Sequence, residues 1–299
     1  EPAALAMAVE KAKETDAELV MASDPDADRV GAAVKNNEGE WVLLNGNQTA
    51  LMFVYYLITR WKELGKINGK EYIVKTIVTT ETIKTIAERN GVEMYDVYTG
   101  FKWIANVMRE NEGKKNYIGG GEESYGFLCE DFVRDKDAVS ACVILAEIAA
   151  WAKDQGLSLY QLLQKIYVEY GFSKEKGISV VKKGKSGAEE IEAMMKKFRE
   201  NPLTEIAGSK VTYFYDYSTL KGKDYAENET VTLDMPTTSN VLQYFTEDNT
   251  KVSIRPSGTE PKIKFYCEVH SKVKNIDELP EAEKAAEEKI NQIKASLGI

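Results

Sequence analysis

Apolar positions along the first 170 residues alternate between helical spacing and short continuous runs, which predicts helices and strands in turn. Strand–helix alternation of this kind is typical of an open α/β sheet, in which ligands bind at the carboxyl ends of the strands. The predicted helices cover 3–15, 47–64, 81–91, 101–111, 137–155 and 157–169. Strands are predicted on both sides of an acidic turn at 23–29, at 41–44, over 72–80, and in MYDVYTG and NYIGGG.

The pattern changes after about residue 172. A charged helix at about 186–201 precedes several runs of aromatic and β-branched residues, and a last helix covers about 280–297. Such a succession predicts antiparallel strands flanked by helices. The runs are KVTYFYDY, TVTLDM, NVLQYFT, TKVSIRP and PKIKFYCEVH. The fold class is therefore α/β followed by an α+β domain.

Length and charge narrow the class of protein. At about 150 residues per domain, 299 residues suggest two domains or three small ones. The chain carries 39 basic and 48 acidic residues, a net charge of −9, which argues against a general nucleic-acid binder. The longest apolar stretch, 138–152, is too short and too polar to span a membrane. We expect neither nucleic acid nor a membrane as a partner.

Cysteine and histidine usage excludes two kinds of site. Three widely separated cysteines without a CxxC pair favour a reducing, cytoplasmic setting over a disulfide framework or a thiolate zinc site. With His270 as the one histidine, no mechanism that needs two is available. Candidate chemistry must therefore come from carboxylates, hydroxyls, arginines and lysines.

The first candidate site is the acidic turn, SDPDADR. Asp24, Asp26 and Asp28 alternate directly after a strand, so their hard oxygen ligands can converge on Mg²⁺ or Ca²⁺. An EF-hand is excluded because Arg29 and Lys35 stand where its glycine and its last glutamate should be. Mg²⁺ completed by a phosphate oxygen fits better. A solvated acidic turn is the alternative.

The second candidate is the glycine-rich segment GGGEESYG at 119–126. In an extended loop, Glu122 and Ser124 would point to the same side and could bind vicinal hydroxyls. The three glycines allow close approach of the backbone. A merely structural glycine turn is the alternative.

The third candidate is SIRPSGTEPK at 253–262. An arginine, two hydroxyls, a glycine and a lysine within a few residues suit a phosphate group, and a plain hairpin turn is the alternative. Lys102, in TGFKW at a strand-to-helix junction, could contact a phosphate or donate a proton. Lys136, in RDKD, belongs to a segment that could contact an anion or cap the following helix.

Three loops in this order, DPDADR, GEESYG and RPSGTEP, with TGFKW ahead of the second, resemble the α-D-phosphohexomutase family of phosphoglucomutases and phosphomannomutases. The branch is similar to the one that includes phosphopentomutases, and the resemblance covers essentially the whole chain. It implies a four-domain enzyme with three α/β sandwich domains and a fourth, TATA-box-binding-protein-like α+β domain. Residues 1–44 would be the second half of domain 2, 45–170 domain 3 and 171–299 domain 4. The chain opens on Glu1-Pro2 without Met and holds no Ser-His-Asn-Pro loop, so the phosphoserine domain is expected before residue 1.

The resemblance also implies roles for single residues. The carboxylates of Asp24, Asp26 and Asp28 would hold Mg²⁺, beside Arg29 at the transferring phosphoryl group. Sugar hydroxyls would bind Glu122 and Ser124, and Lys102 would act as acid/base or contact phosphate, with Lys136 as a further substrate contact. The phosphate that is not transferred would bind the side chains and backbone of Arg255, Ser257, Gly258 and Thr259.

The implied reaction moves phosphate between C1 and C6 of a hexose through a phosphoserine and a hexose 1,6-bisphosphate. Hexose phosphates would be the partners, and this chain would be inactive alone. Three alternatives stay open: a phosphopentomutase, a non-catalytic module that binds Mg²⁺ and phosphosugars, and a phosphatase whose nucleophile is Asp24 or Asp26. The sequence leaves the choice among glucose, mannose and pentose, and the oligomeric state, undetermined.

Overall fold

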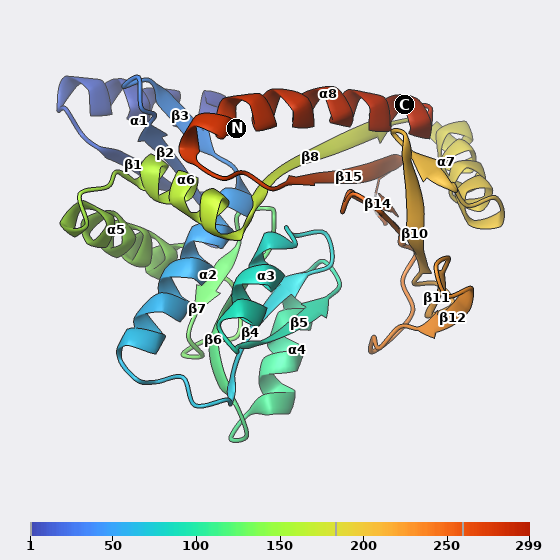
Figure 1. The fold of residues 1–299 in the computed structure, drawn as a ribbon, viewed down its shortest axis with the longest axis horizontal. Helices are drawn as coiled ribbons and strands as arrows, with labels where there is room; N and C mark the ends of the chain where they lie inside the picture. Colours follow the sequence, from blue (N-terminus) through green and yellow to red (C-terminus); the bar gives the residue numbers. More distant parts are fainter. Residues whose placement is uncertain (1, 183, 259) are drawn as a thin grey trace. The chain divides into compact units, whose positions relative to one another are not determined.

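The computed structural model describes residues 2–182, 184–258 and 260–299, and the chain divides into two compact units after Gly171. Each unit is described by itself, and Figure 1 gives the element labels. In the described ranges, no helix is long and apolar enough to cross a membrane.

Unit 1 begins with a helix and a small antiparallel sheet. Helix α1 (Pro2–Glu14) precedes the strands of a meander, β1 (Leu19–Ser23), β2 (Val30–Lys35) and β3 (Trp41–Leu44), which pair in the order β1-β2-β3. Apolar side chains of α1 pack on the sheet in a cluster of Leu5, Ala12, Val20 and Ala33. The packing fixes the β1–β2 hairpin, and with it the acidic turn.

A second, four-stranded sheet carries the rest of unit 1. Strand β4 pairs in parallel with β5 and β6, and β7 closes the edge antiparallel to β6, in the order β5-β4-β6-β7. The strands are β4 (Glu71–Thr76), β5 (Glu93–Val97), β6 (Asn116–Gly121) and β7 (Phe127–Cys129). Because the three parallel strands end at one edge, their following loops gather there.

Helices cover both faces of this sheet. Leu128 of β7 packs with Phe101 and Ile104 of α4, whereas its neighbour Phe127 stacks on Phe53 of α2 with ring centroids 4.6 Å apart. Successive strand residues point to opposite faces, so α2 and α4 lie on opposite sides. The helices are α2 (Gly46–Glu63), α3 (Thr82–Arg89), α4 (Phe101–Asn111), α5 (Ala138–Asp154) and α6 (Leu159–Tyr170). The α/β/α architecture is as predicted.

The predicted strand over 72–80 is wrong in its second half. Strand β4 ends at Thr76, and a turn follows in which the Thr79 N–H donates to the Thr76 carbonyl at 2.9 Å. The β-branched run therefore continues as a packed connection and not as a strand. Its buried threonines are Thr76, Thr79, Thr80 and Thr82. β-branched composition alone does not distinguish a buried strand from a buried connection.

Unit 2 is one antiparallel sheet with helices on one face. The path is β12-β11-β10-β13-β14-β15-β8, with β9 paired to β10. The strands are β8 (Phe172–Val181), β9 (Glu205–Ile206), β10 (Ser209–Asp216), β11 (Lys221–Asp224), β12 (Glu229–Thr232), β13 (Leu242–Thr246), β14 (Lys251–Pro256) and β15 (Lys262–Ser271). The helices are α7 (Gly184–Glu200), a short 3-10 turn (Ile276–Glu278) and α8 (Leu279–Leu297). The α+β class is confirmed, and the TATA-box-binding-protein likeness stays a prediction.

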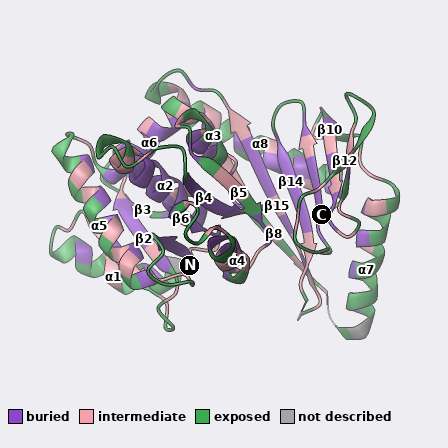
Figure 2. Ribbon diagram, turned by 90° about the horizontal axis from the view of Figure 1, so that it is seen from below, coloured by how far each residue is buried: buried purple, intermediate pink, exposed green. Residues whose placement is uncertain are grey.

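Alternation along β15 separates an apolar face from a polar one. Ile263, Phe265, Cys267 and Val269 are buried on the side of the sheet that carries Ile254 and Val252 of β14. Helix α8 runs along β15 and β8 in Figure 1, and the buried positions of both units follow the strands in Figure 2. Lys264, Glu268 and His270 therefore project from the opposite face of the sheet.

A buried charge cluster lies on that polar face. Glu268 pairs with Lys251 at 2.8 Å and with the His270 ring at 2.7 Å. Glu175 of the neighbouring strand β8 lies directly opposite Glu268. Burial would raise the pKa of Glu268, but the charges of Lys251 and His270 hold it well below its usual range. Burial would lower the pKa of His270, but the charge and hydrogen bond of Glu268 outweigh burial and raise it.

This cluster predicts how the stability of unit 2 depends on pH. With a raised folded-state pKa, His270 stabilises fully below its unfolded value of about 6.5, and the stabilisation is lost as pH rises through the folded value. The depressed pKa of Glu268 acts in acid: its contribution is lost as pH falls below its unfolded value of about 4.3. We expect urea unfolding to show falling stability from pH 6 upward in the wild type and a flatter profile in His270→Gln, which keeps a donor toward Glu268. Parallel profiles would contradict the ion pair.

Candidate functional site

The acidic turn between β1 and β2 is folded by the carboxylate of Asp24. Its Oδ1 accepts the backbone N–H groups of Asp28 at 3.1 Å and Arg29 at 3.0 Å. Ala27 adopts a positive φ of 57°, a strained conformation for alanine, and its N–H donates to the Asp24 carbonyl. The turn brings one carboxylate oxygen each of Asp24, Asp26 and Asp28 within 4.8 Å of one another. The sequence-predicted metal ligands thus converge on one point.

The donor set fits Mg²⁺. Among the described residues, Asp28 Oδ1 is buried without a hydrogen-bond partner, although Arg29 Nε lies 3.6 Å away. Burial would raise the pKa of Asp24, but N–H donation from Arg29 and Asp28 lowers it, so this carboxyl is ionised at neutral pH. Three carboxylates lie close together, with Arg29 and Lys136 as basic neighbours. Carboxylate oxygens are hard anionic ligands of the kind that Mg²⁺ prefers.

Lys136 is the second cation of this cluster, from a segment more than a hundred residues away. Its Nζ lies 2.8 Å from Asp28 Oδ2, and its side chain is 15% exposed. Burial would lower the pKa of Lys136, but the Asp28 carboxylate outweighs burial and raises it. Asp137 caps α5 by accepting the Val139 and Ser140 N–H groups, and the Ala138 N–H donates to the Ala27 carbonyl at 3.0 Å. RDKD thus both caps the helix and supplies a charge.

The glycine-rich loop lies against the acidic turn. The Val30 N–H donates to the Tyr125 carbonyl at 3.1 Å, and Arg29 and Gly126 form an antiparallel bridge. A Cβ at Gly126 would lie 2.5 Å from Lys136 Cδ, so this position needs glycine for the lysine to cross over it. Backbone pairing and the partly buried Lys136 therefore join the predicted metal ligands to the predicted sugar-binding loop.

The extended conformation predicted for the glycine-rich loop is wrong. A turn covers 123–125, closed by the Glu122 N–H donating to the Gly126 carbonyl at 2.9 Å, and Tyr125 has a φ of 73°. Strand alternation therefore does not set the directions of Glu122 and Ser124. The reason is Gly126, whose carbonyl and lack of a side chain close the turn, an interaction that composition does not reveal.

The TGFKW junction reaches the same loop. The Gly100 N–H, at the start of α4, donates to Glu122 Oε1 at 2.8 Å, and Glu122 is 7% exposed. Lys102, one residue into the helix, is exposed and places its ammonium 5.0 Å from the Trp103 ring centroid. Unit 1 thus gathers the acidic turn, the Glu122 loop, the TGFKW junction and Lys136 at one place.

The third predicted loop lies in unit 2. Arg255 is the last residue but one of β14, and the loop closes by the Ser257 N–H donating to the Lys262 carbonyl at 2.7 Å, with Gly258 exposed. Thr259 lies outside the described residues. Lys262, counted among the anion-binding groups by the sequence, pairs with Glu260 at 3.0 Å.

Sequence reasoning missed Lys264. In the β14–β15 register it is directly opposite Arg255, and it is opposite Ser179 of β8 on its other side. Residues directly opposite one another share a sheet face, so a second cation stands beside Arg255. The sequence could have indicated Lys264 only if the register between β14 and β15 had been known, because that register places it opposite Arg255.

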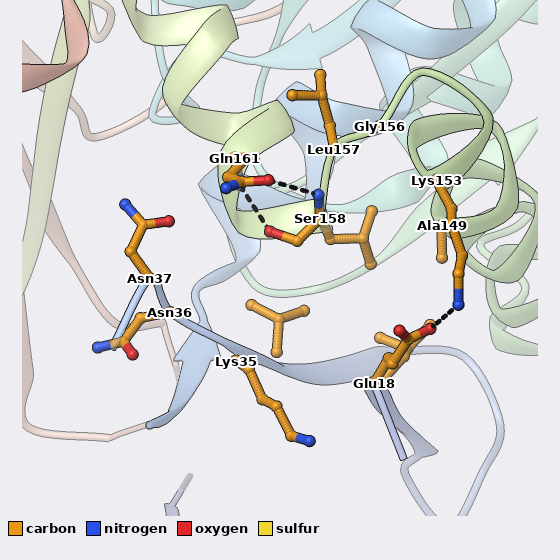
Figure 3. Close-up of a pocket in the computed structure, with 13 residues that line it drawn as sticks. Glu18, Lys35, Asn36, Asn37, Ala149, Lys153, Gly156, Leu157, Ser158 and Gln161 are labelled. Carbon is orange, nitrogen blue, oxygen red and sulfur yellow. Dashed lines mark hydrogen bonds and ion pairs between the residues drawn. The ribbon is translucent and has the colours of Figure 1, made fainter. Parts of the chain in front are cut away.

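A separate cavity of about 490 Å³ lies between the β1–β2 hairpin and α5 and α6 (Figure 3). The predicted site residues do not line it. Its polar side chains already have partners. Lys153 pairs with Glu18 at 2.8 Å, and Ser158 and Gln161 form a capping box. Three others bind residues outside the lining, in the pairs Lys35–Asp16, Asn36–Glu40 and Asn37–Gln164. The cavity therefore presents no convergent set of unpaired chemical groups, and the loops above remain the candidate site.

Comparison with protein families gives two matches. Residues 45–170 match the model of phosphoglucomutase/phosphomannomutase, alpha/beta/alpha domain III, and residues 180–286 match the C-terminal domain of the same family. A phosphoglucomutase of Staphylococcus aureus strain USA300 is 38% identical over 272 residues, covering 91% of this chain and 48% of the relative. One from Staphylococcus haemolyticus is 33% identical over 264 residues, covering 88% and 47%. The chain spans about half the length of the curated relatives it matches.

Solved structures share the fold. A phosphoglucomutase/phosphomannomutase family protein of Burkholderia thailandensis aligns with a TM-score of 0.61 at 19% identity, covering 100% of this chain and 51% of that one. The open form of parafusin from Paramecium, a phosphoglucomutase, aligns with a TM-score of 0.57 at 18% identity, covering 87% and 41%.

Proposed function

Because this chain belongs to the phosphoglucomutase/phosphomannomutase family, we propose that it supplies the metal, sugar and phosphate sites of a phosphosugar mutase. The observation that carries the proposal is the junction in unit 1, where Lys136 crosses Gly126 and pairs with the metal ligand Asp28. The proposed metal site for a phosphoryl group and the proposed loop for sugar hydroxyls would be adjacent there. Residues 1–44, 45–170 and 171–299 would correspond to part of domain 2, domain 3 and domain 4.

The chemistry proposed is transfer of phosphate between C1 and C6 of a hexose. The bond from a seryl oxygen to phosphorus breaks as a sugar hydroxyl oxygen bonds to that phosphorus, and the hydroxyl proton passes to a basic group. The reverse transfer, with the other phosphate of the 1,6-bisphosphate, restores the phosphoserine. When bound, Mg²⁺ would offset the negative charge of the transferring group.

The residues of this chain have distinct tasks in that scheme. Asp24, Asp26 and Asp28 would hold Mg²⁺, and Arg29 would lie beside the phosphoryl oxygens and stabilise their charge. Lys102, which is exposed at the start of α4, would contact a phosphate or exchange a proton. Glu122 and Ser124 would bind sugar hydroxyls, with Glu122 oriented by the Gly100 N–H.

Recognition of the second phosphate falls to unit 2. Arg255 and Lys264 offer two adjacent cations, and the loop adds the hydroxyl of Ser257 and the backbone at Gly258. The two phosphates would thus meet chemically different sites, a metal at one and guanidinium and ammonium groups at the other.

A coupled mutase assay tests the proposal. A polypeptide that joins this chain to a phosphoserine-bearing segment is expected to convert glucose, mannose or ribose 1-phosphate to the isomeric phosphate when Mg²⁺ is present. The 299-residue chain alone should show negligible turnover, because it lacks a Ser-His-Asn-Pro loop. No conversion of any of the three sugars by the joined polypeptide would contradict the mutase proposal, and normal turnover by the chain alone would contradict its dependence on the phosphoserine.

A further inference from the structure

We propose that Thr79 is a positioning residue for sugar recognition, acting through Glu123 on the loop that carries Glu122 and Ser124. The inference rests on the proposed function of that loop. Thr79 belongs to the connection after β4, which the sequence predicts as strand.

The contact between the two segments is a pair of hydrogen bonds. The backbone N–H of Glu123 donates to Thr79 Oγ1 at 3.1 Å, and the Thr76 hydroxyl donates to Glu123 Oε2 at 3.4 Å. The two threonine hydroxyls lie 2.8 Å apart, and both residues are 0% exposed. Glu123 stands between the two side chains assigned to the sugar, so a bond to its N–H fixes the peptide plane that joins it to Glu122.

The threonine turn has support of its own beneath this contact. Lys75 is 1% exposed and donates to Asp96 of β5 at 2.6 Å and to Glu81 at 2.9 Å. The same ammonium contacts the Thr79 carbonyl at 3.4 Å. A buried cation with two carboxylate partners thus holds the turn to β4 and β5.

The glycine-rich loop is confined from its other side by α2. A Cβ at Gly46 would lie 2.0 Å from the Glu123 carbonyl oxygen, so the helix start and the loop backbone are in direct contact. Asn47, next in α2, accepts the Thr80 N–H at 3.0 Å and ties the same helix to the threonine turn. Glu123 is therefore held between two fixed elements, and side chains on preorganised backbone bind with less loss of entropy.

Three variants of the 299-residue chain test this role. Thr79→Val keeps the side-chain shape and removes the acceptor, and Thr79→Ser keeps the acceptor. The control is Thr80→Val, another buried threonine of the same turn, whose hydroxyl oxygen accepts the Thr82 N–H at 3.4 Å. Calorimetry would measure binding of glucose 1-phosphate, its singly deoxygenated analogues, inorganic phosphate and Mg²⁺, and thermal unfolding would record stability.

Thr79→Val is expected to weaken glucose 1-phosphate binding about tenfold, because the partly buried Glu123 N–H loses its acceptor. Thr79→Ser and Thr80→Val should bind like the wild type. Binding of inorganic phosphate and Mg²⁺ should not change. The wild type should bind the analogue that lacks the recognised hydroxyl more weakly than glucose 1-phosphate. Thr79→Val should bind that analogue and glucose 1-phosphate with similar affinities.

Two outcomes separate this inference from the function on which it rests. If the wild type binds glucose 1-phosphate no more tightly than inorganic phosphate, the assignment of the sugar loop is wrong, and the role of Thr79 with it. If the wild type does discriminate and Thr79→Val binds the sugar phosphate equally well, or loses affinity for all ligands alike, the positioning role alone is overturned.

Discussion

Replacing Asp26 with Asn should weaken binding of Mg²⁺ by the chain at least about tenfold, because a divalent cation loses the charge of a directly coordinating carboxylate. Asp26 is the exposed member of the three, and Asp24 Oδ1 is the acceptor that folds the turn. The substitution therefore removes a ligand charge and leaves the support of the loop in place.

Isothermal titration with MgCl₂ measures this effect. Asp16→Asn is the matched control, since Asp16 is also exposed, pairs with Lys35 and lies outside the metal cluster. Without metal, the Asp26→Asn variant should be at least as stable as the wild type, because repulsion among the carboxylates falls. Equal Mg²⁺ affinity of Asp26→Asn and the wild type would rule out the metal assignment.

Replacing Lys136 with Met should have two opposite effects. Mg²⁺ should bind about tenfold more tightly, because the partly buried ammonium 2.8 Å from Asp28 Oδ2 no longer offsets the ligand charge. Binding of glucose 1-phosphate in saturating Mg²⁺ should weaken, because a cation next to the sugar loop is lost. An apolar side chain of similar length keeps the packing over Gly126.

Titrations of both ligands decide this prediction. Lys153→Met is the control, because Lys153 forms a 2.8 Å pair with Glu18 in which both side chains are largely exposed, and such pairs contribute little. A loss of affinity for Mg²⁺ in Lys136→Met would show that the lysine supports the metal site structurally. Unchanged affinities for both ligands would show that its charge reaches neither.

Features set by short stretches of sequence were the predictable ones. The acidic turn needs only its own residues: Asp24 accepts N–H groups four and five positions on, and the flanking strands pair as a hairpin. Helices with clear apolar periodicity appear within a few residues of their expected bounds. Local spacing carries enough information in such cases because the partners are neighbours in sequence.

Strand β8 was missed because its charges have distant partners. Lys174 pairs with Glu283 and Glu287 of α8 at 2.8 and 3.0 Å, and Glu175 is opposite Glu268 in the β15 register. Read alone, FSKEKG resembles a solvated linker. The partners of these charges lie in α8 and β15, roughly a hundred residues away in sequence. Local strand propensity therefore does not indicate that this segment is a strand.

The same limit applies to the candidate site. Composition marks Asp24, Glu122 and Arg255 as candidates, but the pairing of Lys136 with Asp28 and the alignment of Lys264 with Arg255 depend on tertiary contact and strand register. Thr79 shows the difference most clearly, since a buried threonine in a β-branched run has no signal of its own until Glu123 is placed against it.

Calorimetric titration of glucose 1,6-bisphosphate into the chain with Mg²⁺ tests most directly whether the acidic turn of unit 1 and the anion loop of unit 2 serve one ligand. Asp26→Asn and Arg255→Gln, one in each unit, are compared with the wild type. The account predicts one bisphosphate per chain, and an affinity that falls at least about tenfold in each variant, as expected when a charged partner is lost. Unchanged affinity in Arg255→Gln would contradict it. So would two independent binding sites, one weakened only by Asp26→Asn and the other only by Arg255→Gln.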